Sequence, residues 1–356
     1  MIFAPRLFEF KKNKLIPIDE FVEKALYKPD IGYYTKKIPF GKRGDFITAP
    51  TISNLFSEII SIWVISTWEK LGKPKNFNIV ELGPGDGTLV KVLLNVFKKF
   101  PSFYNAKKLF LFEKSKFLTK LQRENIDNTE VKWIKNFNNI KKGPVIFFGN
   151  EFFDAISIKQ FKRSKKSLLE KYYTIRDDNE IFEIFKKASV NDKKMINSFK
   201  TLKNLNFIEF PKNGFDELKK IIKKISILKG CILLVDYGYL KENNQSTLQS
   251  VFKHKKNFLL KNLGKSDITY HVNFSLLSEF FLKNKLKVKK TVTQREFLNR
   301  MGIKLRAEIL SKKMKFRDQS DLYSRLQRLI DPGQMGHLFK IILAYNLKIN
   351  KYPGFK

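Results

Sequence analysis

The stretch Asn78-Ile79-Val80-Glu81-Leu82-Gly83-Pro84-Gly85-Asp86-Gly87-Thr88-Leu89 decides the fold of this chain. Its apolar first half predicts a short buried strand, and the three glycines that follow predict a tight turn. From Thr88 onward, apolar residues recur at helical spacing as far as about residue 99. A ligand at this turn would lie at the carboxyl end of a strand and would meet the unpaired N–H groups at the start of a helix.

The spacing of the glycines and the acid before them indicate which kind of ligand this is. A dinucleotide-binding fingerprint is G-x-G-x-x-G, whereas the glycines at 83, 85 and 87 follow G-x-G-x-G. Glu81 would repel a pyrophosphate by Coulomb's law, but it would attract an ammonium group. S-adenosylmethionine carries an ammonium group and no phosphate, so it suits this turn. The alternative is an ordinary strand–turn–helix with incidental glycines.

A second acidic residue ends the next apolar run. Residues 107–113, Lys-Lys-Leu-Phe-Leu-Phe-Glu, predict a buried strand that closes on Glu113. This acid occupies the topological place of the ribose-binding acid in Rossmann folds, although it lies 30 residues past Gly83 rather than about 20. Its carboxylate can accept hydrogen bonds from both ribose hydroxyls. A solvated glutamate at a strand end is the alternative.

The chain then alternates between strands and helices, as expected for an α/β sheet. We predict a strand over residues 131–134, with Asn136 after it as a neighbour of an adenine, and a fully buried strand over 144–149. The latter ends in Asn150-Glu151-Phe152-Phe153-Asp154. Two carboxylates and an amide beside a ligand could handle a nitrogen acceptor. The alternative is a solvated turn, which the two phenylalanines disfavour.

Length and composition restrict the class of protein. With 356 residues, of which 43% are hydrophobic, the chain can form one large α/β domain or two domains. No apolar run approaches the ~20 residues of a membrane span, and residues 1–14 lack the apolar core of a secretory signal. The single cysteine, Cys231, excludes an internal disulfide, and no usual zinc cluster is expected from one cysteine and three histidines. We also expect no hydrolase triad around His271 or His337.

The net charge of +36 would ordinarily suggest a nucleic-acid partner. The lysines, however, are spread over nearly every segment, and Lys, Phe, Ile and Asn all have AT-rich codons. A biased genome therefore explains the composition without a ligand. The phenylalanines mostly occur in continuous apolar runs rather than between basic residues on an exposed strand face. We expect no specific nucleic-acid partner, only non-specific adhesion to RNA at low salt.

The N-terminal part of the chain predicts two helices around an unusual loop. A short helix is expected over residues 18–26, and a long apolar helix that Ser53 caps should end at Gly72. Glu58 on the long helix is a candidate for a polar pocket contact, and a solvated helix face is the alternative. Residues 32–50 are rich in glycine, proline and aromatic residues, which favours a lid or pocket wall over a plain surface connection.

The sequence divides into four consecutive segments. These are an N-terminal helical cap with the pocket loop (1–75), the first half of the cofactor-binding sheet (76–155), inserted strands (156–215) and the second half of the sheet with helical additions (216–356). Period-two alternation in the third segment predicts antiparallel strands. In the fourth, we expect a buried strand over 230–239 and a long polar excursion over 240–269.

Taken together, these blocks resemble the MidA family, class I S-adenosylmethionine-dependent methyltransferases linked to mitochondrial complex I assembly and found widely in bacteria. The matching stretches cover most of the chain; they are Gly32-Tyr33-Tyr34, Gly44 to Pro50, Glu81 to Leu89, Asn150 to Ala155, Asp236-Tyr237-Gly238, Asp267 to Phe274, Gln294 to Ile303 and Met335 to Lys340. Thr51 stands where the family usually has a glutamate, and His337 stands where it often has one. The lysine-rich insert matches poorly.

The resemblance implies a class I methyltransferase fold: a Rossmann-like α/β protein with a seven-stranded sheet, an N-terminal helical cap and an inserted β-rich segment. It implies S-adenosyl-L-methionine as the cofactor and arginine N-methylation of a quinone-side subunit of NADH dehydrogenase (complex I). The location would be cytoplasmic in a bacterium or the mitochondrial matrix in a eukaryote. A homodimer is compatible with the sequence.

The resemblance also implies roles for individual residues. Those that would hold the methionine moiety are Glu81, Gly83, Gly85 and Gly87, and Glu113 would hold the ribose. The other expected cofactor contacts are Thr48, Pro50 and Asn136. Those that would face the acceptor are Asn150, Glu151 and Asp154. Carboxylates that pair a guanidinium bidentately would fix the approach of its attacking nitrogen.

Three other functions stay open. A non-catalytic assembly chaperone would bind S-adenosylmethionine without turnover. An RNA methyltransferase, which only the charge favours, would bind RNA with an affinity that falls steeply as salt increases. A nicotinamide oxidoreductase is disfavoured by Glu81 and by the glycine spacing.

Overall fold

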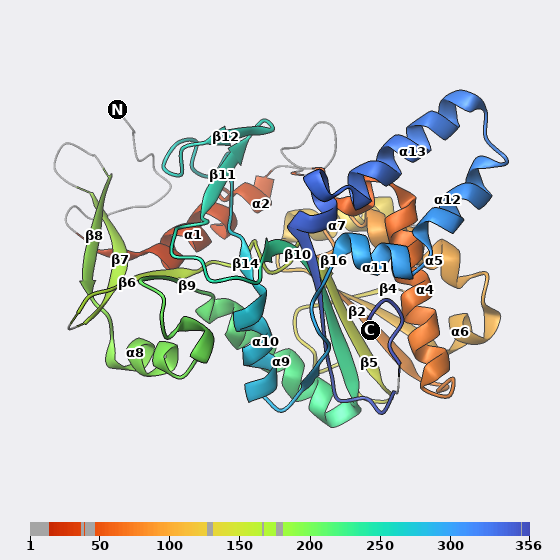
Figure 1. The fold of residues 1–356 in the computed structure, drawn as a ribbon, viewed down its shortest axis with the longest axis horizontal. Helices are drawn as coiled ribbons and strands as arrows, with labels where there is room; N and C mark the ends of the chain where they lie inside the picture. The colour runs from red at the N-terminus through yellow and green to blue at the C-terminus, as the bar shows by residue number, and fades with distance from the viewer. Residues whose placement is uncertain are drawn as a thin grey trace. The chain divides into compact units, whose positions relative to one another are not determined.

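The computed structural model describes residues 14–36, 39, 47–126, 131–165, 167–175, 181–349 and 351–356. The chain forms two compact units, each assembled from separate stretches (Figure 1). Unit 1 contains residues up to 46, 153–219 and 239–283, and unit 2 contains residues 47–152, 220–238 and 284–356. The expected insert over 156–215 thus lies wholly in unit 1, whereas each of the other three expected segments is divided between the units.

Unit 2 contains the α/β sheet. Its main path, among the described residues, runs in the order β15 (Lys287–Val288), β17 (Phe339–Tyr345), β10 (Gly230–Tyr239), β5 (Val145–Asn150), β2 (Phe77–Leu82), β3 (Lys107–Phe112) and β4 (Val131–Ile134). The five strands from β10 to β4 are parallel, and β17 runs antiparallel to β10, to β15 and to the short strand β16 (Val292–Thr293). The strands predicted over 107–113, 131–134, 144–149 and 230–239 are confirmed.

The helices of unit 2 bury apolar side chains against the sheet or against one another. The helices of unit 2 are α3 (Ala49–Ile52), α4 (Asn54–Lys70), α5 (Thr88–Phe97), α6 (Pro101–Ala106), α7 (Lys116–Asn125), α11 (Gln294–Arg300), α12 (Ile303–Ser311) and α13 (Phe316–Ile330), followed by the turn η2 (Pro332–Gly336). The Ser53 hydroxyl accepts a hydrogen bond from the Leu55 N–H at 3.3 Å, which confirms the predicted cap of α4. Trp63 of α4 and Cys231 of β10 belong to the buried core of this unit.

Unit 1 contains the strands that the alternating pattern predicted. An antiparallel sheet runs β1 (Ile16–Pro17), β7 (Leu168–Ile175), β6 (Lys159–Arg163) and β9 (Phe207–Phe210), and β8 (Ile181–Lys187) pairs with β7. The helices are α1 (Ile18–Tyr27), α2 (Tyr33–Lys36), α8 (Val190–Asn197), η1 (Lys200–Leu202) and α10 (Phe274–Lys283), and a short strand β14 (Val272–Asn273) precedes α10. The helix α9 (Lys212–Leu228) begins in unit 1 and ends in unit 2.

Two loop predictions are wrong in part. Residues 33–36 form the helix α2 with Tyr33 and Tyr34 buried, and α3 begins at Ala49, because buried aromatic and apolar contacts outweigh the local glycine and proline signals. The rest of the predicted lid, residues 37, 38 and 40–46, lies outside the described residues. The polar excursion over 240–269 contains a small antiparallel sheet, β12 (Lys255–Asn257), β11 (Gln249–Phe252) and β13 (Asp267–Thr269). None of the described helices combines the length and apolar character that crossing a membrane requires.

Candidate active site

The carboxyl ends of four neighbouring parallel strands bring the predicted polar residues to one edge of the unit 2 sheet. Glu81 of β2 is in register with Leu111 of β3 and with Phe148 of β5. Asn150 of β5 is in register with Val235 of β10. Glu113 directly follows β3, so the acids and the amide lie along the edge where open α/β sheets bind ligands.

The glycine turn after β2 requires residues without a side chain. Gly83, Gly85 and Gly87 have φ angles of 61°, 59° and 84°, in the left-handed region that favours glycine. A Cβ atom on Gly83 would lie 3.1 Å from the ring of Phe152, and one on Gly87 would lie 2.8 Å from Ile126. The turn therefore keeps its backbone close to two side-chain walls, and the helix α5 starts from Gly87.

Glu81 is the chemically unusual residue of this edge. Its side chain is only 3% exposed, and Oε2 has no hydrogen-bond partner among the described residues. Burial raises the pKa of Glu81 to about 8, and the charges of Asp86 and Glu113 add to the rise. A buried carboxyl with an unpaired oxygen is costly unless a cation binds to it. The ammonium group of S-adenosylmethionine fits this requirement.

Neighbouring residues donate hydrogen bonds to both carboxylate oxygens of Glu113. Oε1 accepts a hydrogen bond from the Ser115 N–H at 2.8 Å, and Oε2 accepts one from Nε2 of Gln122 at 3.1 Å. Burial raises the pKa of Glu113, and these two hydrogen bonds oppose the rise. Each carboxylate oxygen has a further lone pair, so an oriented Glu113 can still accept from ribose hydroxyls.

Sequence reasoning missed two residues that shape this edge. Gln122 is completely buried and links Glu113 to the glycine turn through the backbone oxygen of Gly85. Phe152 packs where a side chain on Gly83 or Gly149 would otherwise lie. No sequence signal marked Gln122, because a glutamine on an amphipathic helix normally faces water. In the sequence, Phe152 argues against a solvated turn but indicates no contact with the glycine turn.

The remaining cofactor candidates all lie in unit 2 as well. Thr48 precedes α3 and Pro50 is in its first turn, and α3 packs against α5, the helix that follows the glycine turn. Asn136 follows β4, is exposed, and accepts a hydrogen bond from the Asn138 N–H at 3.0 Å through Oδ1. The roles of these three residues as cofactor contacts remain a prediction.

The three acceptor candidates are divided between the units. In unit 2, Asn150 ends β5, and its Nδ2 donates a hydrogen bond to Oε1 of Glu151 at 3.1 Å. Glu151 has a φ of 51°, which is strained for a residue other than glycine, and its N–H donates to the Val235 oxygen at 2.9 Å. Such strain is retained where the surrounding structure fixes it, as at functional sites.

Asp154 belongs to unit 1 and is 5% exposed. Burial raises the pKa of Tyr34, and the negative charges of Asp267 and Asp154 contribute to that rise. All three side chains are buried.

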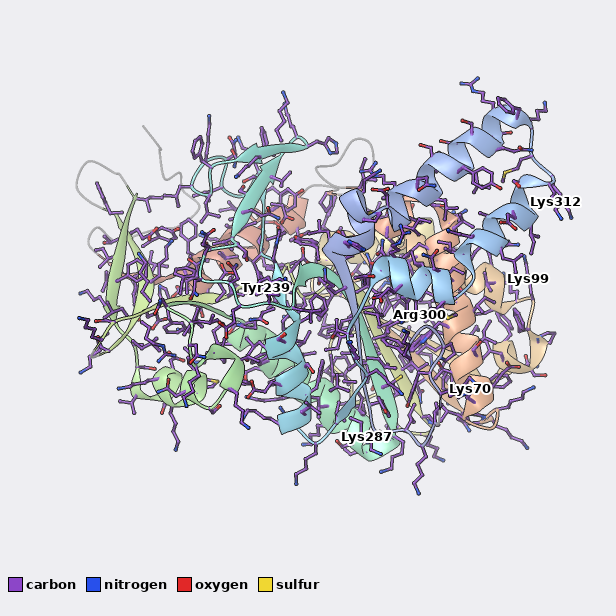
Figure 2. The ribbon with its side chains drawn as sticks, in the orientation of Figure 1. Lys70, Lys99, Tyr239, Lys287, Arg300 and Lys312 are labelled. Carbon is purple, nitrogen blue, oxygen red and sulfur yellow. The ribbon has the colours of Figure 1, made fainter. Side chains whose placement is uncertain are left out.

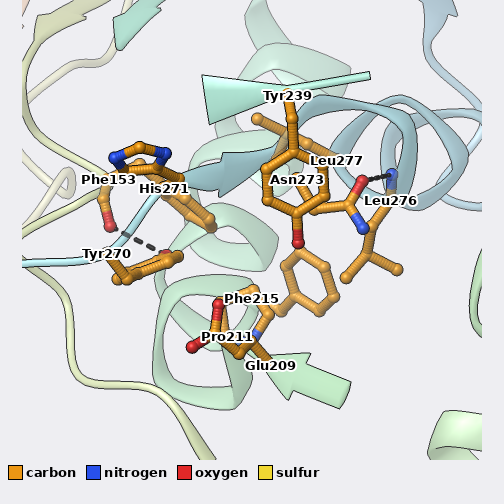
Figure 3. Close-up of a pocket in the computed structure, with 10 residues that line it drawn as sticks. All are labelled: Phe153, Glu209, Pro211, Phe215, Tyr239, Tyr270, His271, Asn273, Leu276 and Leu277. Atoms are coloured by element: carbon orange, nitrogen blue, oxygen red, sulfur yellow. Dashed lines mark hydrogen bonds between the residues drawn. The ribbon is translucent and has the colours of Figure 1, made fainter. Parts of the chain in front are cut away.

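Unit 1 also contains a small cavity between β9, α9 and α10 (Figure 3). Its volume of about 10 Å³ is room for one water molecule. The lining residues are Phe153, Glu209, Pro211, Phe215, Tyr239, Tyr270, His271, Asn273, Leu276 and Leu277. The Tyr270 hydroxyl closes one side by donating to the Phe153 backbone oxygen at 3.0 Å. The cavity is too small for a cofactor or a guanidinium, so it is a packing feature.

The distribution of metal-ligating and of basic side chains can also be described. Among the described residues, no group of three or more His, Cys, Asp or Glu side chains is arranged to hold a metal ion. The exposed cations of unit 2 are spread over separate elements, as Lys70, Lys99, Lys287 and Lys312 illustrate (Figure 2).

Comparison with known proteins decides the family. The family model described as "Putative S-adenosyl-L-methionine-dependent methyltransferase" matches residues 59–292, more than half of the chain. A Caenorhabditis elegans relative, "Protein arginine methyltransferase NDUFAF7 homolog, mitochondrial", is 30% identical over 351 residues, which is 91% of this chain and 82% of the relative. The chain belongs to the MidA family of S-adenosyl-L-methionine-dependent methyltransferases.

Further relatives and a solved structure support this family assignment. "Protein arginine methyltransferase NDUFAF7, mitochondrial" of Xenopus tropicalis is 28% identical, and the match covers 94% of this chain and 83% of the relative. The Homo sapiens protein of the same name is 26% identical, and the match covers 94% of this chain and 80% of the relative. The structure of a Burkholderia thailandensis protein bound to S-adenosylhomocysteine has a TM-score of 0.80 at 22% identity, covering 96% of this chain and 90% of that one. The predicted class I methyltransferase fold and the S-adenosyl-L-methionine cofactor are confirmed.

Proposed function

We propose that this MidA-family methyltransferase transfers a methyl group to an arginine side chain of a protein. The proposal is supported by the relatives, which are named protein arginine methyltransferases and match more than nine-tenths of the chain. We further propose a quinone-side subunit of NADH dehydrogenase as the acceptor, as the family resemblance implies. The reaction would then take place in the cytoplasm of a bacterium or in the matrix of a mitochondrion. We include a homodimer in the proposal, to be measured by light scattering.

The observation that best supports binding of S-adenosylmethionine is the unpaired, buried oxygen of Glu81 beside the glycine turn. S-adenosylmethionine supplies an electrophilic methyl group on a sulfonium. Glu81 would bind its ammonium group as a carboxylate, and Glu113, oriented by Gln122, would accept from the ribose hydroxyls. The glycine turn would let the backbone approach the ligand closely. Each of these contacts positions the cofactor rather than reacting with it.

The acceptor end of the proposal rests on Asn150 and Glu151. Asn150 fixes one carboxylate oxygen of Glu151 by a hydrogen bond of 3.1 Å, and the strained backbone of Glu151 is anchored to Val235. A carboxylate oriented in this way can pair with the N–H groups of a guanidinium. That contact would direct the attacking nitrogen and keep positive charge on the other two nitrogens. Asp154 is proposed as a second acceptor contact.

The test is methyl transfer from labelled S-adenosylmethionine to the co-purified NADH dehydrogenase subunit, followed by hydrolysis and identification of the labelled amino acid. We expect labelled methylarginine with the wild-type protein, and a loss of about 100-fold or more with Glu151→Gln, because a neutral amide cannot pair with a guanidinium as a carboxylate does. Glu308→Gln, at an exposed position of α12, is the matched control and should leave the rate unchanged.

The outcomes separate the rival functions. Normal methylation by Glu151→Gln and by Asp154→Asn would show that these acids do not contact the acceptor. Binding of S-adenosylmethionine without any labelled product would favour the assembly chaperone. Label recovered in RNA, with binding that weakens steeply as salt rises, would identify an RNA methyltransferase instead.

A further inference from the structure

The helix α12 of unit 2 has apolar residues on two opposite faces. The residues that pack in or against the core of the unit are Ile303, Ala307 and Leu310. Leu305 and Ile309 are two residues out of step with this row, and two residues turn an α-helix by about 200°. These two side chains therefore face away from the core, and they are 61% and 49% exposed.

The exposed row leads along α12 to the turn before α13 (Figure 1). Lys312 is exposed at the end of α12, and Phe316, the first residue of α13, is 86% exposed. The contact of α13 with α3 lies farther along the helix, where Nη1 of Arg325 donates to the backbone oxygen of Ile52 at 3.2 Å. Arg325 is about two and a half helical turns from Phe316, so the turn lies well away from that contact.

Cations flank the three exposed apolar side chains. In residues 303–317 the one acidic residue is the exposed Glu308, and Arg306 is paired with Glu58 at 2.7 Å. Asp318 follows in the first turn of α13, where a negative charge stabilises the start of a helix. The exposed cations of this stretch are Lys304, Lys312, Lys313, Lys315 and Arg317. We call these five cations, together with Leu305, Ile309 and Phe316, the hairpin surface.

We propose that the hairpin surface binds to a membrane that contains anionic lipids. Helices that lie in a membrane interface bury apolar side chains at the boundary between headgroups and acyl chains, and their cations contact the anionic headgroups. Lysine side chains are long enough to reach the headgroups while their apolar neighbours enter the membrane. A fluid membrane also needs no complementary pocket, which suits a convex helix face. This proposal does not depend on the identity of the methyl acceptor.

The charge of the hairpin surface disfavours two other occupants. A two-fold dimer places the same patch of both copies together, so five cations of one copy would approach five of the other, and such like-charge contacts cost free energy. A nucleic acid would pair with the cations, but it would offer Leu305 and Ile309 no apolar surface of the kind that a membrane offers. The lysine-rich composition of the chain explains the cations without explaining the apolar side chains beside them.

Co-sedimentation with vesicles tests the apolar part of the proposal. The full-length protein is mixed with phosphatidylcholine vesicles that contain about 30% phosphatidylglycerol, at near-physiological ionic strength. The site variant is Leu305→Gln/Ile309→Gln/Phe316→Gln, which removes apolar surface while it keeps the net charge, and glutamine is a good helix former. We expect its affinity for the vesicles to be lower than that of the wild-type protein by roughly tenfold or more.

The matched control is Val190→Gln/Ile227→Gln/Leu282→Gln. These three apolar residues of α8, α9 and α10 are 82%, 64% and 56% exposed. Both triple variants keep the charge of the chain, so non-specific adhesion to anionic lipid is the same in both. The control should bind the vesicles within about twofold of the wild-type affinity.

A second pair of variants tests the cations. Lys312→Gln/Lys313→Gln removes two exposed charges at the end of α12, and Lys98→Gln/Lys99→Gln removes two exposed charges at the end of α5. The net charge of the chain is equal in the two variants. We expect the first variant to bind the vesicles roughly tenfold more weakly than the second, because only its lysines would lie near the headgroups.

Fluorescence quenching shows whether the hairpin surface enters the membrane. Phe316→Trp places an indole at the exposed start of α13, and brominated lipids quench indoles that reach the acyl chains. Trp63 and Trp68 are buried, and the wild-type protein measures the background signal of its own tryptophans. We expect added quenching in Phe316→Trp and none in the control Val190→Trp.

Four results would overturn the proposal. These are equal vesicle affinity of the two triple variants, equal affinity of the two lysine variants, quenching in Phe316→Trp no greater than the background, and a dimer in light scattering that the site variant alone abolishes while its vesicle binding is unchanged. The last result would identify a second copy of the chain as the occupant. Equal S-adenosylhomocysteine affinity in all variants reports an intact fold. If the site variant loses that affinity, the lysine variants and the quenching measurement decide.

Discussion

The side chain of Gln122 holds Glu113 in place, with Nε2 of the amide donating to Oε2 of the carboxylate at 3.1 Å. The same nitrogen donates to the Gly85 backbone oxygen at 2.8 Å, and Oε1 of Gln122 accepts from Nε1 of Trp133 at 2.9 Å. One buried side chain thus joins the glycine turn after β2 to the acid after β3. Both parts of the proposed cofactor site depend on its position.

Replacing Gln122 by leucine should therefore weaken cofactor binding. The change keeps the volume but leaves the Trp133 N–H and one oxygen of Glu113 without their partner, at a cost of about 1–3 kcal/mol for each buried group. We expect S-adenosylhomocysteine affinity to fall roughly tenfold in calorimetry. Gln319→Leu is the control, because Gln319 of α13 also donates two hydrogen bonds, to the backbone oxygens of Ser311 and Met314, but contacts no residue of the proposed cofactor site through them. Equal affinity in the two variants would show that Gln122 does not position the site.

The raised pKa of Glu81 makes stability depend on pH. The pKa is 4.5 for an ordinary glutamate and about 8 for Glu81 in the folded protein, so the unfolded chain ionises first. The wild-type protein should then lose stability as pH rises from about 4.5 to about 8, by up to about 1.4 kcal/mol per pKa unit. Glu81→Gln cannot ionise and should escape this loss.

Urea denaturation of the cofactor-free protein across this pH range measures the effect. We expect the free energy of unfolding of Glu81→Gln to exceed that of the wild-type protein by an amount that grows up to about pH 8 and then stays constant. The same variant should no longer bind S-adenosylhomocysteine. A constant difference at all pH values would mean that Glu81 is ionised throughout.

Gly87 and Gly302 form a natural pair for testing the turn. Both precede a helix, and their φ angles are 84° and 83°. A Cβ atom on Gly87 would lie 2.8 Å from Ile126, whereas one on Gly302 would meet nothing within 4 Å. Alanine at either position incurs the cost of the left-handed conformation, about 1 kcal/mol. Gly87→Ala should reduce the free energy of unfolding by more than this amount, because its Cβ also meets Ile126. It should also be the only one of the two variants that weakens cofactor binding. Similar losses of stability in the two variants would show that Ile126 moves aside easily.

Much of this fold could be predicted from local patterns. The parallel strands are continuous apolar runs because both faces are buried, and Glu81, Glu113 and Asn150 meet at one edge because parallel strands end together. The glycine turn was visible because only glycine takes its φ angles readily. These features depend on residues that are close together in the sequence.

The rest depends on contacts between distant residues. Gln122 acts on Gly85, which is 37 residues away, so its role cannot be seen in its helix. The strands between 249 and 269 have only three or four residues each, and they form only because they pair with one another. The acceptor motif is continuous in sequence, yet the division between the units falls between Phe152 and Phe153.

Glu58, which the sequence suggested as a pocket contact, is instead paired with Arg306 of α12, 248 residues away. Its two oxygens accept from Nε at 2.7 Å and from the Nη2 nitrogen at 3.0 Å. The two side chains are 19% and 34% exposed, so solvent weakens the pair, and we expect a coupling free energy of about 1 kcal/mol. A double-mutant cycle with Glu58→Gln and Arg306→Gln, measured by urea denaturation, tests this. Both single variants should keep cofactor affinity within about twofold, because the pair links α4 to α12 rather than facing the ligand. A large loss of affinity in Glu58→Gln alone, with additive effects on stability, would restore the original assignment of Glu58 to the pocket.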